Sequence, residues 1–119
     1  MKRFSEDSGP IPEREPERRA YPRYKVHKIV TYTYREKQLL TVTVDLGMGG
    51  MKIKTHYKLP IDESMNFKIV LGGNTISSEG RIVYSKTLPD TGRVSGIQFL
   101  RRSRHDSALL RAYLSAVEE

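Results

Sequence analysis

Two arginines near the start of the chain have the chemistry and the spacing to hold an anionic ligand. Arg19 and Arg23 stand four residues apart in the segment Arg18-Arg-Ala-Tyr-Pro-Arg23. A planar guanidinium donates paired hydrogen bonds to phosphate, and its flat face stacks on an aromatic base. In an extended segment, residues four apart lie on the same side of the backbone, so both can grip one ligand. Basic runs at domain edges are also common as plain solvated surface, so the pair alone is a weak signal.

A glycine-rich segment, Asp45-Leu-Gly-Met-Gly-Gly50, is the second candidate. Gly47, Gly49 and Gly50 permit a positive φ and a close approach of the backbone to a ligand. Successive amide groups in such a turn form a concavity that binds anions. Asp45 supplies acceptors for the N1 and N2 edge of a guanine. The alternative is a strand connection that needs glycine only for its geometry, and in isolation this alternative is preferred.

The composition favours an anionic partner and removes several kinds of chemistry. The 119 residues carry 21 Lys+Arg against 14 Asp+Glu, a formal net charge of +7. Such an excess favours a nucleotide, a nucleic acid or an acidic membrane surface, although a solvated basic surface without a partner stays open. The sequence has no cysteine, which excludes disulfides, thiolate nucleophiles and cysteine-based zinc sites.

Enzymatic, metal-dependent and membrane-spanning roles find no support in the sequence. The three histidines are His27, His56 and His105, and they lie in separate segments without metal-ligand spacing. No base–nucleophile pair, P-loop or dinucleotide motif is present. We therefore expect neither a metal site nor an enzyme. No stretch approaches the roughly 18 apolar residues of a membrane span. The first residues also lack the apolar region of a secretory signal, so we expect a cytoplasmic protein.

The elements that position these candidates follow from the pattern of residues. Residues 1–20 are rich in proline and charge and predict a flexible tail, whereas residues 21–119 predict one domain. Dense β-branched residues and period-two alternation predict six strands, at 27–34, 40–44, 51–55, 65–71, 75–85 and 94–99. In the fifth strand, Ile76, Ile82 and Tyr84 are expected on one side, and Gly80 is expected to mark a bulge or bend.

A single helix is expected to close the chain at residues 103–118. Ser103-Arg-His-Asp106 is a variant of the capping box, and apolar residues then recur at helical spacing. Six consecutive strands with short connections predict an antiparallel meander or barrel. The fold class is therefore all-β with one C-terminal helix, as a six-stranded antiparallel β-barrel.

Taken together, the arginine element and the glycine element resemble the PilZ domain family. An Arg-x-x-x-Arg element precedes the first strand, and a variant of an Asp-x-Ser-x-x-Gly element lies between the second and third strands. Residues 80–84 and 96–99 are similar to the closing strands of that family. The resemblance covers about residues 18–100 and the following helix. It implies a six-stranded barrel and a bacterial receptor for cyclic di-GMP, with no further cofactor.

The resemblance also implies roles for individual residues. Arg19 and Arg23 match the arginines that hold the phosphates and stack on guanine. Asp45 matches the position that reads a guanine edge, and Gly50 matches the closing glycine. An arginine at position 18 resembles family members that bind a stacked, intercalated pair of ligand molecules rather than one.

Two positions are less simple. Tyr84 falls near a position where some members place an aromatic ring over a base, and a place in the barrel core is an equal alternative. Gly47 departs from the family pattern, which has serine there. The missing hydroxyl removes one possible hydrogen bond, worth about 0.5–1.5 kcal/mol, or several-fold to tenfold in affinity. On this basis Gly47→Ser is expected to strengthen binding or leave it unchanged.

Three functions follow in order of preference. The first is a receptor or adaptor whose N-terminal arginine segment becomes ordered on ligand binding. It then signals to a partner protein of motility, pilus or polysaccharide machinery. The second is a PilZ-fold interaction module that does not bind nucleotide, for which Gly47 is the only support. The third is a barrel that binds single-stranded nucleic acid. The seven tyrosines do not interleave clearly with basic residues, so the third is disfavoured.

Overall fold

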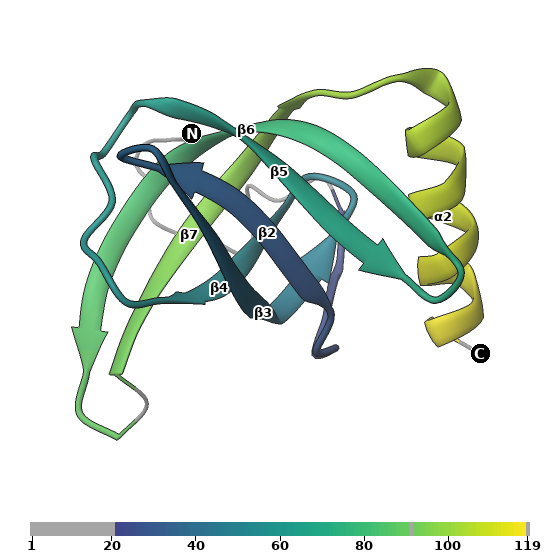
Figure 1. Cartoon of the computed structure of the whole chain (residues 1–119). Helices are drawn as coiled ribbons and strands as arrows, with labels where there is room; N and C mark the ends of the chain where they lie inside the picture. Colours follow the sequence, from purple (N-terminus) through teal and green to yellow (C-terminus); the bar gives the residue numbers. More distant parts are fainter. Residues whose placement is uncertain (1–20, 91, 119) are drawn as a thin grey trace, which may run out of the picture.

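The computed structural model describes residues 21–90 and 92–118. Over these residues the chain forms strands and a single helix (Figure 1). The strands are β1 (Arg23–Tyr24), β2 (Ile29–Tyr34), β3 (Lys37–Gly47), β4 (Gly50–Thr55), β5 (Ser64–Leu71), β6 (Asn74–Leu88) and β7 (Gly92–Arg101), and the helix is α2 (Arg104–Glu118). The tail expected at 1–20 lies outside the described residues.

The sheet closes on itself through strand β3. The strand order is β1-β3-β2-β5-β6-β7-β4, every pairing is antiparallel, and β3 also pairs with β4. The first part of β3 pairs with β2 and its last part pairs with β4, so six long strands form a complete ring. Closure leaves no long unpaired edge. The prediction of a six-stranded antiparallel barrel with a C-terminal helix is confirmed.

Strand β1 is the element that periodicity did not predict. Its two residues pair with the end of β3, with Arg23 opposite Gly47 and Tyr24 opposite Leu46. The expected glycine-rich turn is correspondingly shorter. Gly47 ends β3 and Gly50 begins β4, so only two residues connect the strands. The candidate residues that the structure describes therefore lie mostly on strands, which hold them more firmly than a loop.

The barrel interior holds the apolar residues that alternate along the strands. Its fully or nearly buried members come from β2 to β7 and include Val30, Tyr32, Leu46, Met51, Ile53, Phe67, Ile69, Ile76, Ile82 and Ile97. The rings of Tyr32 and Phe67 pack with their centroids 5.6 Å apart. Gly80 lies beside this core at a register shift, as predicted, and a Cβ there would lie 3.1 Å from the Phe67 ring.

Tyr84 does not share the inward side of β6 with Ile76 and Ile82. The register of β6 against β7 shifts between Ile82 and Tyr84, so Val83 is the extra residue of a bulge. Such an insertion reverses the faces of the residues that follow it. The expectation that Tyr84 lies on the same side as Ile82 is therefore wrong, for a reason that alternation alone does not reveal.

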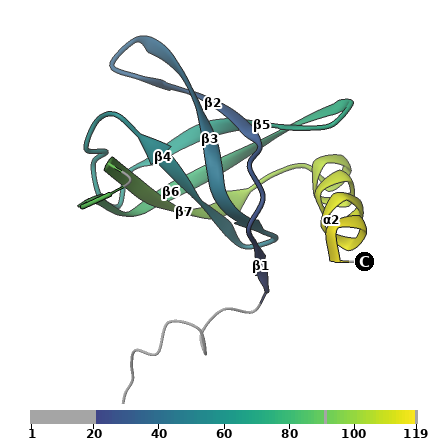
Figure 2. The ribbon, with the colours of Figure 1, turned by 90° about the horizontal axis from the view of Figure 1, so that it is seen from below.

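Helix α2 lies to one side of the barrel, next to the β5–β6 hairpin (Figures 1 and 2). It packs through the buried Leu110 and Leu114 and contacts both β6 and β1. Ser103 caps it by accepting a hydrogen bond from the Asp106 amide at 3.0 Å. The Asp106 carboxylate instead accepts a hydrogen bond from the Ser77 amide at 3.0 Å, which ties the first turn of the helix to β6.

Removing the largest fully buried side chain should test this packing. We expect Phe67→Ala to lower the free energy of unfolding by about 3–5 kcal/mol, because it leaves a cavity at a fully buried site. Leu40→Ala is the matched control, since Leu40 is 65% exposed on the outer surface. Urea denaturation measures both, and equal small losses would contradict the assignment of Phe67 to the core.

Candidate functional site

An ion pair joins the second candidate arginine to the candidate aspartate. Arg23 Nη1 lies 3.0 Å from Asp45 Oδ1, and the two side chains are only 20% and 15% exposed. The same carboxylate oxygen accepts a hydrogen bond from the Lys52 amide at 3.1 Å. The Arg23 guanidinium also lies over Gly50, because a Cβ built on that glycine would meet Nη2 at 3.0 Å. Arg23, Asp45 and the end of the turn therefore form one assembly.

A bulge in β3 is what turns Asp45 outward. Thr43 is buried and pairs with Ile53, and the register then shifts so that Asp45 pairs with Lys52. Val44 is the inserted residue. Thr43 stays fixed inside, where its hydroxyl accepts a hydrogen bond from the amide of residue 28 at 2.8 Å. The carboxylate thus lies on the outer surface while the strand remains anchored in the core.

Strand pairing carries this outer surface across to Tyr84. Asp45 pairs with Lys52, Lys52 with Gly96, and Gly96 with Tyr84. Directly paired residues point to the same face of a sheet, so these four form one row over four strands. The Tyr84 ring lies across Gly96, where a Cβ would overlap it. The Lys86 ammonium lies 5.0 Å from the ring centroid.

The structure places Tyr84 outside the barrel core, which was one of the two alternatives for this residue. The side chain is only partly buried and is not a member of the hydrophobic core. It lies on the same outer face as Asp45, as a ring that stacks on a ligand must. Sequence reasoning did not identify Lys52 or Gly96 as parts of the site. The only signal was the outward side of the alternation at residues 51–55, which carries Lys52.

Gly47 has a structural reason to lack a side chain. A Cβ at this position would overlap the carbonyl oxygen of Pro22. That carbonyl precedes Arg23, which pairs directly with Gly47. The Gly47→Ser expectation is therefore reversed, because a serine would push β1 off β3 and displace Arg23. The three glycines of the turn are also not needed for a positive φ, since among described glycines only Gly72 and Gly92 adopt one.

The other two glycines of the turn also allow close packing. A Cβ at Gly49 would come within 3.3 Å of the Tyr21 ring, and a Cβ at Gly50 would overlap the carbonyl oxygen of Ile97. The Gly49 carbonyl accepts a hydrogen bond from the Phe99 amide at 2.9 Å. The turn is thus clamped between the N-terminal segment on one side and β7 on the other.

Arg102 is a residue of this region that sequence reasoning missed. Its Nη2 donates a hydrogen bond to the Met48 carbonyl at 2.9 Å, and its guanidinium carbon lies 5.3 Å from the centroid of the Phe99 ring. Burial first, and then the nearby positive charge of Arg111, lower the pKa of Arg102. The sequence offers no signal that separates Arg102 from the neighbouring Arg101, whose side chain is 85% exposed.

Several residues singled out in the sequence are not placed in this assembly. Arg18 and Arg19 fall outside the described residues, so the first arginine of the pair is not placed. His27 serves the barrel, because its Nδ1 lies 3.0 Å from the Thr43 carbonyl, which accepts its hydrogen bond. Within residues 21–90 and 92–118, no group of three or more potential ligands is arranged for a metal ion. Over the same residues no helix has the length and apolar character of a membrane span.

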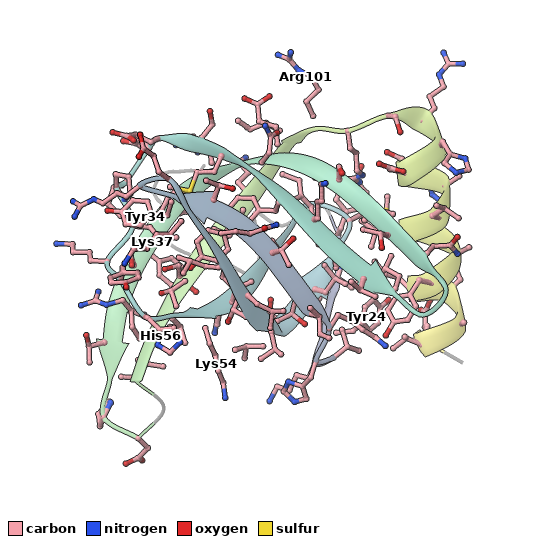
Figure 3. All side chains as sticks on the ribbon, viewed as in Figure 1. Tyr24, Tyr34, Lys37, Lys54, His56 and Arg101 are labelled. Atoms are coloured by element: carbon pink, nitrogen blue, oxygen red, sulfur yellow. The ribbon has the colours of Figure 1, made fainter. Side chains whose placement is uncertain are left out.

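Side chains on β4 and β1 show which way the strands around the ion pair face. Lys54 projects outward from β4, two residues beyond Lys52 (Figure 3). Tyr24 of β1 points instead toward the side of the barrel where α2 lies (Figure 3), and it packs against the core. The two residues of β1 therefore have different roles. Tyr24 packs against the core and anchors the strand, and Arg23 faces the site.

Comparison with known proteins agrees with this architecture. The family model of the PilZ domain matches residues 17–116, and the chain belongs to that family. No curated protein matches the chain. The resemblance recognised from the arginine and glycine elements is confirmed.

Solved structures share the fold at low sequence identity. The Bacillus subtilis inhibitor of motility MotI/DgrA is 19% identical with a TM-score of 0.77, covering 90% of this chain and 56% of its own. Escherichia coli YcgR in complex with c-di-GMP is 17% identical with a TM-score of 0.73, covering 85% and 46%. The chain therefore spans about half the length of these two proteins. The isolated PilZ domain of YcgR with c-di-GMP is 16% identical with a TM-score of 0.64, covering 85% and 92%.

Adding a single methyl group at Gly47 should test the docking of β1. We expect Gly47→Ala to destabilise the β1–β3 pairing by about 1–3 kcal/mol, which is about 5-fold to 150-fold in local opening. Hydrogen exchange of the amides that join β1 to β3 measures this without any ligand. Gly73→Ala is the control, because nothing lies within 4 Å of the added Cβ. Unchanged exchange in Gly47→Ala would contradict the steric argument.

Proposed function

We propose that the chain is a receptor for cyclic di-GMP. The observation that carries the proposal is the assembly of Arg23, Asp45 and the glycine turn on one outer face of a PilZ barrel. This assembly offers a guanidinium for phosphate and a carboxylate for a guanine edge side by side. The complexes of YcgR with c-di-GMP support the choice of ligand. The role is that of a receptor and not of an enzyme.

The ion pair holds the two groups that would contact the ligand in fixed positions. The ligand carries two phosphates and two guanines, so it presents both an acceptor for Arg23 and donors for Asp45. Because the pair is largely buried and Asp45 is fixed by the Lys52 amide, both groups are oriented before the ligand arrives. Preorganised polar groups lose less entropy on binding. Arg23 already lies in β1, so the ordering on ligand binding is proposed for the arginines that precede it, Arg18 and Arg19.

Tyr84 is proposed to stack on a guanine at the far end of the row. Its ring lies on the same face as Asp45, and Gly96 leaves room for it to lie flat on β7. The Lys86 ammonium near the ring adds positive charge at that end. An arginine at position 18 is consistent with an intercalated pair of ligand molecules, and we propose this stoichiometry.

The output is proposed to be a change of surface read by another protein. A ligand with two negative charges would neutralise part of a basic face. It would also hold the N-terminal arginine segment against the barrel. A motility protein is one candidate partner, since a structural neighbour is described as an inhibitor of motility, and pilus or polysaccharide machinery are the others. We propose that this signalling takes place in the bacterial cytoplasm.

Replacing Arg23 should separate a receptor from a fold without nucleotide binding. We expect Arg23→Ala to weaken the binding of cyclic di-GMP at least about 100-fold, because it removes a charge-assisted contact and leaves Asp45 unpaired. Isothermal titration calorimetry measures the affinity. Arg101→Ala is the control, since Arg101 is 85% exposed and lies away from the ion pair.

Two outcomes would contradict the proposal. Absence of heat with the unchanged protein would favour the alternative of a PilZ-fold interaction module that does not bind nucleotide. Equal affinities for Arg23→Ala and Arg101→Ala would move the ligand away from this site.

The aromatic row gives a separate prediction. We expect Tyr84→Ala to weaken cyclic di-GMP binding by about tenfold, because stacking on a base contributes roughly 1–3 kcal/mol. Tyr84→Phe is the matched variant and should bind within about twofold of the unchanged protein, since it keeps the ring. Calorimetry of both variants, each with its far-UV spectrum unchanged, measures the difference. Equal affinities for the two variants would rule out stacking.

A further inference from the structure

We propose that Arg102 is a third arginine of the ligand site, which positions the glycine turn and supplies positive charge beneath it. The proposal rests on the proposed function and extends the site to the end of β7. Arg19 and Arg23 come from the N-terminal side of the chain, whereas Arg102 comes from its opposite end. It reaches the turn across 54 residues of sequence.

Arg102 holds one peptide of the turn in a fixed orientation. Its Nη2 donates to the Met48 carbonyl at 2.9 Å. In a planar trans peptide the carbonyl and the following N–H point in opposite directions. The Gly49 N–H therefore points away from Arg102, and the next carbonyl, that of Gly49, is held by the Phe99 amide at 2.9 Å. A fixed, outward amide in a glycine turn is a preorganised donor for an anion.

The surroundings of Arg102 are poor for a guanidinium unless an anion joins them. Its buried Nε has no hydrogen-bond partner within residues 21–90 and 92–118. Among the described residues no carboxylate lies within ion-pair distance of it, and Arg111 is a like charge nearby. A buried polar atom without a partner costs stability, and so does a desolvated charge without a close counter-charge. The Phe99 ring and the more distant Asp106 carboxylate offer only a partial compensation.

This cost points to binding rather than to stability. An apolar side chain of similar length at position 102 could lie on Phe99 without burying an unpartnered nitrogen. Replacing buried charged groups with apolar ones is often neutral or stabilising. Groups that lower stability are typical of binding sites. Tyr21, between the two motif arginines in the sequence, lies against the same turn, because a Cβ at Gly49 would come within 3.3 Å of its ring.

If Arg102 serves binding at a cost in stability, replacing it should lower the affinity for the ligand without lowering the melting temperature. We expect Arg102→Met to melt at the same temperature as the unchanged protein or higher, while its affinity for cyclic di-GMP falls about tenfold. Arg102→Lys keeps the charge but not the planar fork and should fall between the two. Arg101→Met, at the adjacent exposed residue, should change neither value. Calorimetry and thermal unfolding measure the two quantities on the same full-length samples.

The outcomes also separate this proposal from the proposed function. Unchanged affinity in Arg102→Met, with or without a lower melting temperature, would overturn the proposal while leaving the receptor intact. If the unchanged protein itself does not bind cyclic di-GMP, the proposed function fails. Inorganic pyrophosphate then serves as the anionic probe, followed at the Gly49 amide by NMR. We expect the chemical-shift change of the Gly49 amide on adding pyrophosphate to be at least about threefold smaller in Arg102→Met than in the unchanged protein. Equal changes in the two proteins would overturn the role of Arg102.

Discussion

The ion pair between Arg23 and Asp45 is the interaction on which the site depends. It joins β1 to β3, and a hydrogen bond from the Lys52 amide extends it to β4. Because both side chains are mostly buried, either one alone would be a poorly solvated charge. The pair forms only because Gly47 lacks a side chain, since the Pro22 carbonyl occupies the place of its Cβ. A serine at position 47 would add a hydroxyl for the ligand. Glycine instead lets β1 pair with β3 before the ligand arrives, so fewer groups have to become ordered on binding.

Much of the fold could be predicted from the sequence, because alternation in the strands reports directly on burial. Tyr32 of β2, and Phe67 and Ile69 of β5, follow the period-two rule and lie inside. The rule fails where a bulge inserts a residue. The bulge at Val83 turns Tyr84 outward. No residue in the neighbouring sequence predicts this bulge. Strand β1 is too short to show any period.

The candidate site could be predicted only in part. Arg23, Asp45 and Gly50 were found because their order along the chain matches a known pattern, and the structure brings them together. The reason for glycine at position 47 could not be found, since it depends on a backbone contact made only in the folded barrel. Arg102 was missed because its link to the Met48 carbonyl spans the sequence and follows no motif.

An NMR titration of the uniformly labelled chain with cyclic di-GMP is the most direct test that Arg23, Asp45 and the glycine turn form one ligand site. We predict saturable shifts concentrated at the amides of residues 21, 23, 24, 45–52 and 102. Little change is expected at the distant turn of residues 35–36, which joins β2 to β3. Absence of saturable shifts, or shifts centred on that distant turn, would contradict a site built on the ion pair.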